Sequence, residues 1–170
     1  KVSQFFGIEI DPSAVHIARV AMWITDHQMN LEAARVFGTA RPTIPLVDSA
    51  TIVAGNALQT DWAEVLKPSL CTYLLGNPPF IGKQNQTEAQ KADMTAVCGA
   101  IRNAGLLDYV AGWYVKAMHY IAGHPHIDVA FVSTNSITQG EQVAVLWAPM
   151  LAAGVHIRFG HRTFRWKNEG

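Results

Sequence analysis

The chain has 170 residues, of which 49% are hydrophobic and 15% charged, and its formal net charge is zero. These values fit one globular domain with a real core, and they exclude a disordered chain. Apolar runs never reach the roughly 18 residues of a membrane-spanning helix, so such a helix is not expected either.

The first residues and the cysteines bear on the setting of the protein. Residues 1–4 contain neither an initiating Met nor a signal-peptide pattern, so we expect a fragment of a longer protein. Cys71 and Cys98 show no metal spacing and no disulfide framework, which favours a reduced, cytoplasmic location.

The chain is predicted to alternate strands with helices. Short apolar runs predict strands at residues 5–11, 51–56, 71–75, 128–133 and 155–160. Helical spacing of apolar residues predicts helices at 13–30, 86–98, 108–122 and 138–150, and one helical turn at 62–66, with a break at 41–45. The fold class is therefore α/β with a mostly parallel sheet.

The run Asn77-Pro78-Pro79-Phe80 is the most informative motif, because it stops an apolar strand abruptly. It brings an amide, a proline carbonyl and an aromatic ring together at one strand end. The two prolines fix the backbone there. These three groups together are suited to binding the exocyclic amino group of a flat base. The alternative is a simple strand terminator with Phe80 in the core.

The motif resembles the signature of class I S-adenosylmethionine-dependent amino-methyltransferases, whose Asn-Pro-Pro-Phe form is typical of DNA adenine-N6 enzymes. The resemblance implies a Rossmann-like fold and makes Asn77, Pro78, Pro79 and Phe80 the catalytic residues. The Asn77 side-chain oxygen and the Pro78 carbonyl would accept the hydrogens of the target amino group. Phe80 would stack on a base swung out of the duplex.

The same resemblance implies a site for S-adenosylmethionine. Glu9, in the run Gly7-Ile8-Glu9-Ile10-Asp11-Pro12, matches the acid that binds the ribose hydroxyls, and Ile10 would lie against the adenine. Asn56 and Ala57 follow the next strand, where the family often has Asp, so a plain Asn turn remains an alternative. Asp11 is interpreted as a helix N-terminal charge.

Several longer runs are similar to one branch, the methylase part of the single-chain Type IIG/IIL restriction–modification enzymes. They are residues 76–84, 90–94, 107–110 and 133–142. The resemblance covers about residues 5–167. It implies that DNA is the partner of the full-length protein, contacted mostly by parts outside this chain.

The family's Gly-rich first motif should precede Glu9, yet only eight residues do. We therefore expect residues 1–170 to be a partial catalytic domain that lacks the first strand, binds the cofactor weakly, and exposes apolar strand edges that permit self-association. Two other functions stay open: methylation of amino groups in RNA or protein glutamine, and a non-catalytic domain with an incomplete pocket.

Some residues carry weaker expectations. The run 133–139 either caps the next helix or forms a substrate-pocket wall. Lys83 is either a phosphate contact or an exposed lysine, and the aromatic stripe of 108–121 is core. The histidines show no ligand spacing, so no metal is assigned. The C-terminal part of the chain is basic, and this basic end is either a solvated surface or a DNA contact. The cations of the basic end are Arg158, Arg162, Arg165 and Lys167. Phe164 or Trp166, in the same region, is a candidate for stacking on the base.

Overall fold

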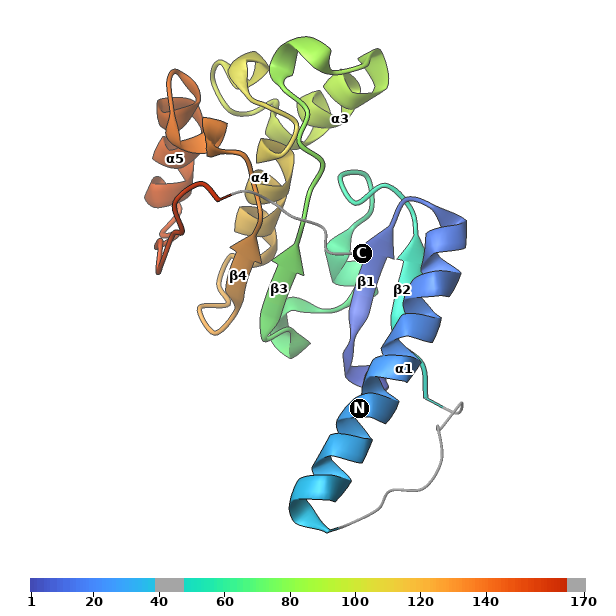
Figure 1. Ribbon diagram of the computed structural model, residues 1–170. Helices are drawn as coiled ribbons and strands as arrows, with labels where there is room; N and C mark the ends of the chain where they lie inside the picture. Colours follow the sequence, from blue (N-terminus) through green and yellow to red (C-terminus); the bar gives the residue numbers. More distant parts are fainter. Residues whose placement is uncertain (39–47, 165–170) are drawn as a thin grey trace. The chain divides into compact units, whose positions relative to one another are not determined.

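The computed structural model describes residues 1–38 and 48–164, which divide into two compact units, residues 1–67 and residues 68–170 (Figure 1). Each unit contains one two-stranded parallel sheet, as the predicted α/β class requires. The expected break at 41–45, and Arg165, Trp166 and Lys167, lie outside the described residues. Among the described helices, none has the length and apolar character needed to cross a membrane.

The first unit is built on strands β1 (Phe6–Glu9) and β2 (Thr51–Ala54), joined by helix α1 (Pro12–Phe37). In the parallel register, Glu9 lies opposite Ala54, so both strands end at the same edge. The short helix α2 (Trp62–Val65) follows β2.

Helix α1 starts where the sequence predicts. The Asp11 carboxylate accepts a 2.8 Å hydrogen bond from the amide of Ser13, and Pro12 occupies the first turn. Asp11 thus lies at the helix N-terminus, where a charge was expected, and its side chain also caps the helix. The helix ends at Gly38, whose φ of 68° is the left-handed conformation that glycine adopts at low cost.

Helix α1 is joined to the β2 side of its unit by two long-range bonds. Arg19 donates a 2.9 Å bond to the Ile52 carbonyl, and the Trp23 indole donates a 2.8 Å bond to the Asp48 carbonyl. Only one residue of α1, Val15, is buried within the described structure. Large apolar side chains of this helix are therefore exposed: Ile17, Val20, Ile24, Met29, Leu31, Val36 and Phe37.

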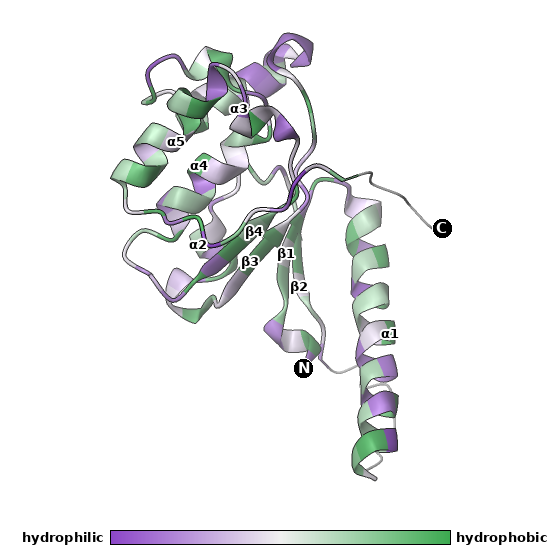
Figure 2. Cartoon of the chain, turned by 60° about the vertical axis from the view of Figure 1, so that its left-hand side comes forward, coloured by the Kyte–Doolittle hydropathy of each residue, from purple (hydrophilic) through white to green (hydrophobic). Residues whose placement is uncertain are grey.

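The second unit pairs strand β3 (Tyr73–Gly76) with strand β4 (Asp128–Phe131). Three helices complete it: α3 (Glu88–Cys98), α4 (Ala111–Tyr120) and α5 (Gln142–Ala152). Helix α5 is largely hydrophobic (Figure 2). The largest fully buried side chains of the unit are those of Cys98, Leu107, Val110, Val115 and Leu146.

The expected last strand at residues 155–160 is wrong. No regular structure forms there; instead the amide of Val155 donates a 3.1 Å bond to the Met150 carbonyl at the end of α5. The alternation of Val155, Ile157 and Phe159 suits a strand, but a strand also needs a neighbour. Within the described residues β4 pairs only with β3, and Ile157 and Phe159 are exposed.

Element boundaries also shift by several residues. Helix α1 runs seven residues past the expected end near residue 30, and α4 and α5 begin three and four residues later than residues 108 and 138. Before α5 the chain forms a short 3₁₀ helix, η5 (Asn135–Thr138), in place of the expected first turn. Such differences are usual because helix ends depend on local capping more than on periodicity.

Candidate functional site

The Asn77–Phe80 turn leaves β3 at the carboxyl end of the β3–β4 sheet (Figure 1). Pro78 is buried, whereas Asn77 and Pro79 are exposed and Phe80 is 48% exposed. Phe80 is therefore not the core residue that a simple strand terminator would place there. The turn anchors itself through Pro78 and presents an amide and a ring to solvent.

Gly76 precedes this turn and touches the neighbouring strand. A Cβ atom at Gly76 would lie 3.0 Å from two ring atoms of Phe131, so only glycine fits without a shift. The Phe131 ring in turn packs edge-to-face on Tyr114 of α4, at 5.2 Å between ring centroids, and Tyr114 packs likewise on Trp147 of α5. The expected aromatic core of α4 thus supports the strand end that carries the turn.

Ser133 lies at the same carboxyl edge and bonds to Tyr114, with 3.1 Å between the two hydroxyl oxygens. Burial raises the pKa of Tyr114, and the bond with Ser133 partly offsets that rise. Helix capping, the first alternative for residues 133–139, is not observed, because neither η5 nor α5 has a side-chain cap bond. Thr134 and Ser136 instead share a 2.6 Å hydroxyl contact, and Gln139 lines a pocket.

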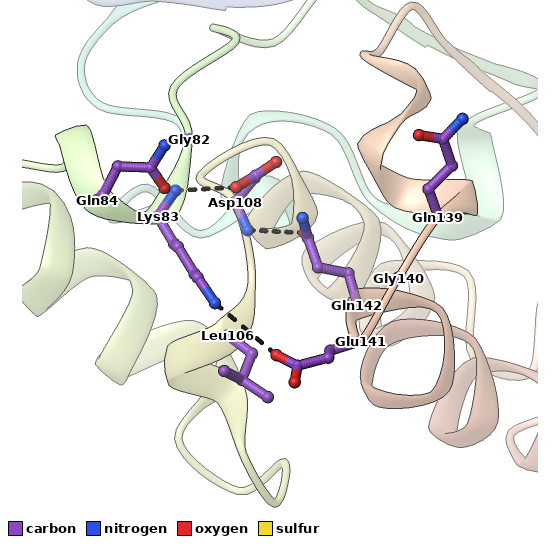
Figure 3. A pocket seen from close by; sticks show the side chains of 9 residues that line it. All are labelled: Gly82, Lys83, Gln84, Leu106, Asp108, Gln139, Gly140, Glu141 and Gln142. Carbon is purple, nitrogen blue, oxygen red and sulfur yellow. Dashed lines mark hydrogen bonds and ion pairs between the residues drawn. The ribbon is translucent and has the colours of Figure 1, made fainter.

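The segment after the turn is held by the run 107–109. The Tyr109 amide donates a 2.9 Å bond to the Ile81 carbonyl, and the Lys83 amide donates a 2.8 Å bond to Asp108 Oδ1 (Figure 3). The Asp108 amide donates a 2.9 Å bond to Gln142 Oε1 at the start of α5. These bonds tie the turn to two helices.

A pocket of about 320 Å³ opens beside this junction (Figure 3). Its charged side chains are Lys83, Asp108 and Glu141, and Lys83 Nζ lies 3.9 Å from Glu141 Oε2. Lys83 therefore pairs with an acid of its own unit. The remaining lining residues are small, apolar or amide: Gly82, Gln84, Leu106, Gln139, Gly140 and Gln142.

Neighbouring residues lower the pKa of the Asp108 carboxyl. Partial burial alone would raise its pKa, but hydrogen bonds with Gln142, Ser136 and the Lys83 amide, together with the Lys83 charge, lower the pKa below its ordinary value. The carboxylate is consequently ionised at neutral pH. Ionised acceptors form the stronger hydrogen bonds, so the charge reinforces the junction.

The first unit gathers the expected cofactor residues at one sheet edge. One Glu9 oxygen accepts a 3.0 Å bond from the Asp11 amide, and the Gly55 amide donates a 2.8 Å bond to the Glu9 carbonyl. Ile10 is 70% exposed beside it. Asn56 and Ala57 follow Gly55 directly and are half-buried.

Asn56 is engaged in a local turn. Its side-chain oxygen accepts a 2.9 Å bond from the Leu58 amide, and the Ala57 carbonyl accepts a 2.8 Å bond from the Trp62 indole. The turn alternative for Asn56 is thus realised.

Two features of the site escaped the sequence analysis. Gln86 and Asp93 are buried polar residues: Gln86 donates a 3.0 Å bond to the Leu107 carbonyl, and Asp93 accepts a 2.7 Å bond from the Tyr109 hydroxyl. Gln142 was the other omission. Asp93 and Gln142 lie in the runs 90–94 and 133–142, whose resemblance to the family was the available signal for them. Residues 1–38 and 48–164 contain no cluster of His, Cys, Asp or Glu able to hold a metal ion.

The basic end is represented in the described residues by Arg158 and Arg162. Arg158 forms an ion pair with Asp128, at the start of β4. Phe164 is exposed. These observations are typical of a solvated surface, and the use of this end in DNA binding stays a prediction.

Comparison with known proteins gives consistent matches. Residues 1–170 match the family described as MmeI, DNA-methyltransferase domain. The chain is 41% identical over 170 residues to DNA methyltransferase A of Bacillus subtilis (strain 168), covering 98% of this chain and 19% of that protein. It also matches the structure of the Type IIL restriction–modification enzyme MmeI in complex with DNA, with a TM-score of 0.93 and 53% identity, over 99% of this chain and 23% of that one.

The family match and the structural match together define a DNA-methyltransferase domain, as the resemblance had implied. The chain spans about a fifth of the length of both relatives. It belongs to the MmeI DNA-methyltransferase domain family.

Proposed function

We propose that this chain transfers a methyl group from S-adenosylmethionine to the N6 amino group of adenine in DNA, as part of a longer restriction–modification polypeptide. The observation that carries the proposal is the Asn77–Phe80 turn at the carboxyl end of β3, with Pro78 buried and Asn77 and Phe80 presented to solvent. Ligands of parallel α/β sheets bind beyond the carboxyl ends of the strands. The same proposal assigns the two parallel sheets to a Rossmann-like class I methyltransferase fold.

The residues at the edge of the first unit fit the cofactor. S-adenosylmethionine supplies an electrophilic methyl group on a sulfonium, carried by an adenosine. Glu9 offers a second carboxylate oxygen to the ribose hydroxyls, since the bond from the Asp11 amide is made to one oxygen. The exposed Ile10 side chain offers an apolar surface to the adenine, and Asn56 and Ala57 complete the edge.

The turn residues act on the target amino group. Its nitrogen lone pair is conjugated into the adenine ring and is a poor nucleophile. Acceptance of its two hydrogens by the Asn77 side-chain oxygen and the Pro78 carbonyl localises that lone pair and aims it at the methyl group. Pro78 and Pro79 hold the carbonyl in place, and Phe80 stacks on the extruded base.

The longer polypeptide supplies the rest of the function. Both relatives are about five times the length of this chain, and one of them was solved as a complex with DNA. We infer that the target sequence is read, and most phosphates contacted, outside residues 1–170, because these residues carry no net charge.

The test is transfer of a labelled methyl group from S-adenosylmethionine to unmethylated DNA by the complete natural polypeptide that contains this chain. The variant is Asn77→Ala, and the matched control is Asn85→Ala, an exposed asparagine in the same unit. We expect N6-methyladenine from the wild type and from Asn85→Ala. Loss of one preorganised acceptor in Asn77→Ala should lower kcat about 100-fold or more.

The other outcomes are informative. Transfer to RNA or to protein glutamine, with none to DNA, would keep the site and replace the substrate. Absence of transfer to any of the three would favour a non-catalytic domain. Equal activity of Asn77→Ala and wild type would remove the turn from the mechanism.

A further inference from the structure

The run Leu107-Asp108-Tyr109 is joined by hydrogen bonds to several other segments of the second unit. Its carbonyl, amides, carboxylate and hydroxyl form five hydrogen bonds of 2.7–3.0 Å with residues outside α4. The partners lie in the segment after the catalytic turn, in α3 and in α5: Ile81, Lys83, Gln86, Asp93 and Gln142.

Three of these partners belong to the segment 81–86, which begins immediately after Phe80. The segment has little regular structure of its own, only the single 3₁₀ turn η3 (Lys83–Asn85). Its position is therefore set by hydrogen bonds to residues 107–109. Asp108 supplies the bond nearest the middle of the segment, through the Lys83 amide.

Asp108 differs from Leu107 and Tyr109 because its side chain, and not its backbone, bonds to the segment 81–86. Its carboxylate accepts from Lys83 while its own amide donates to Gln142, at the first residue of α5 (Figure 3). The bond from the Tyr109 hydroxyl to Asp93, in contrast, is buried and joins α3 to the start of α4, and the contact of Tyr109 with the segment 81–83 is made by its backbone amide.

We propose that Asp108 is a positioning residue for methyl transfer: it fixes the segment 81–83, and through it the orientation of Asn77 and Phe80 toward the target base. The inference rests on the proposed function. A shift of about 1 Å in a reacting group can cost about 100-fold in rate, so loss of the anchor should appear in kcat.

The experiment compares Asp108→Ala, Asp108→Asn and Asp128→Ala in the complete polypeptide. Asp108→Asn keeps an acceptor oxygen for the Lys83 amide. Asp128→Ala is the matched control, because this half-exposed aspartate lies at the opposite end of the sheet, paired in register with Tyr73. Two readouts are needed: single-turnover methyl transfer with KM for DNA, and hydrogen exchange of the backbone amides at 81–86.

We expect Asp108→Ala to lower the transfer rate about 10- to 100-fold with KM for DNA changed less than about threefold, and to speed exchange at 81–86. Asp108→Asn should recover most of the rate, and Asp128→Ala should match the wild type in both readouts. Tyr109→Phe tests a purely structural contribution, since it removes the bond to Asp93 and should lower Tm without changing kcat.

A wild-type rate in a folded Asp108→Ala, an effect confined to KM, or unchanged exchange at 81–86 would overturn the inference. If Asp108→Ala does not fold, Gln142→Leu carries the test, because it removes the acceptor of the Asp108 amide and keeps the side-chain size. A wild-type protein that transfers no methyl group would instead refute the proposed function. In that case, exchange at 81–86 still decides whether Asp108 holds the segment.

Discussion

Gly76 and Phe131, the paired last residues of β3 and β4, lie so close that a Cβ atom at Gly76 would come within 3.0 Å of the Phe131 ring. Because Asn77 follows Gly76, this contact lies at the point where the Asn77–Phe80 turn leaves the sheet. A larger side chain at position 76 should therefore displace the turn.

Gly76→Ala should destabilise the second unit by about 1–3 kcal/mol, the usual cost of overpacking, and should lower methyl transfer by the complete polypeptide. The measurements are urea unfolding and the transfer rate. Gly105→Ala is the control, since a Cβ there meets nothing within 4 Å. The double variant Gly76→Ala/Phe131→Leu should regain stability, and failure to do so would show that the ring is not the obstacle.

Glu9→Gln should weaken binding of S-adenosylmethionine by about 10-fold or more, because it replaces a charged acceptor of ribose hydroxyls with a neutral one. Isothermal titration calorimetry on the complete polypeptide measures this. Glu32→Gln provides the comparison in the same unit, since Glu32 forms an ion pair with Arg35 on an exposed turn of α1. Identical affinities for the two variants would remove Glu9 from the cofactor site.

Cys98 gives the second unit an alkaline pH dependence. Its side chain is fully buried, and burial raises the pKa of the thiol from 9.0 to about 11. An acid whose folded pKa is raised stabilises the fold below its unfolded pKa and loses that contribution as the pH rises. The free energy of unfolding should thus fall between pH 9 and about 11.

Cys98→Ala isolates this contribution, because the other titrating groups are common to both proteins. The stability difference between wild type and Cys98→Ala should shrink between pH 9 and about 11 and stay constant below pH 8. A difference independent of pH would mean that the thiol ionises equally in both states.

The sequence predicted those element boundaries that are set by the residues at the boundary itself. The end of β3 follows from an apolar run that meets two prolines, and the start of α1 follows from Asp11 and Pro12. The length of α1 was underestimated because its apolar residues have no clear period. The prediction of a strand at 155–160 was wrong because alternation of side chains does not indicate whether a partner strand is available.

The residues of the candidate site likewise divide into those that a local pattern predicts and those that depend on long-range contacts. Asn77–Phe80 and Glu9 carry local patterns, and the structure places each at the carboxyl end of a strand. The bond from Lys83 to Asp108 spans 25 residues and that from Asp108 to Gln142 spans 34. Contacts at such separations leave no trace in periodicity or capping, so the roles of Asp108 and Gln142 required coordinates.

The isolated residues 1–170 should self-associate, as their exposed apolar side chains imply. Tyr73 and Leu75 project from the same face of β3 and are 69% and 73% exposed, and α1 adds seven more large apolar residues. Sedimentation velocity should show dimers or larger species that increase with concentration. Leu75→Lys should reduce them, whereas a wild-type fragment that stays monomeric would contradict the prediction.

The junction at residues 107–109 also divides the second unit into stretches that differ in their tolerance of length change. Between α3 and Leu107 the chain is a series of turns, and a Cβ at Gly105 would meet only open space, so inserted residues can loop outward. One extra residue between Leu107 and Tyr109 would instead put Gln86, Lys83 and Gln142 out of step with their partners. Relatives are therefore expected to vary in loop length before Leu107 and to keep the spacing after it.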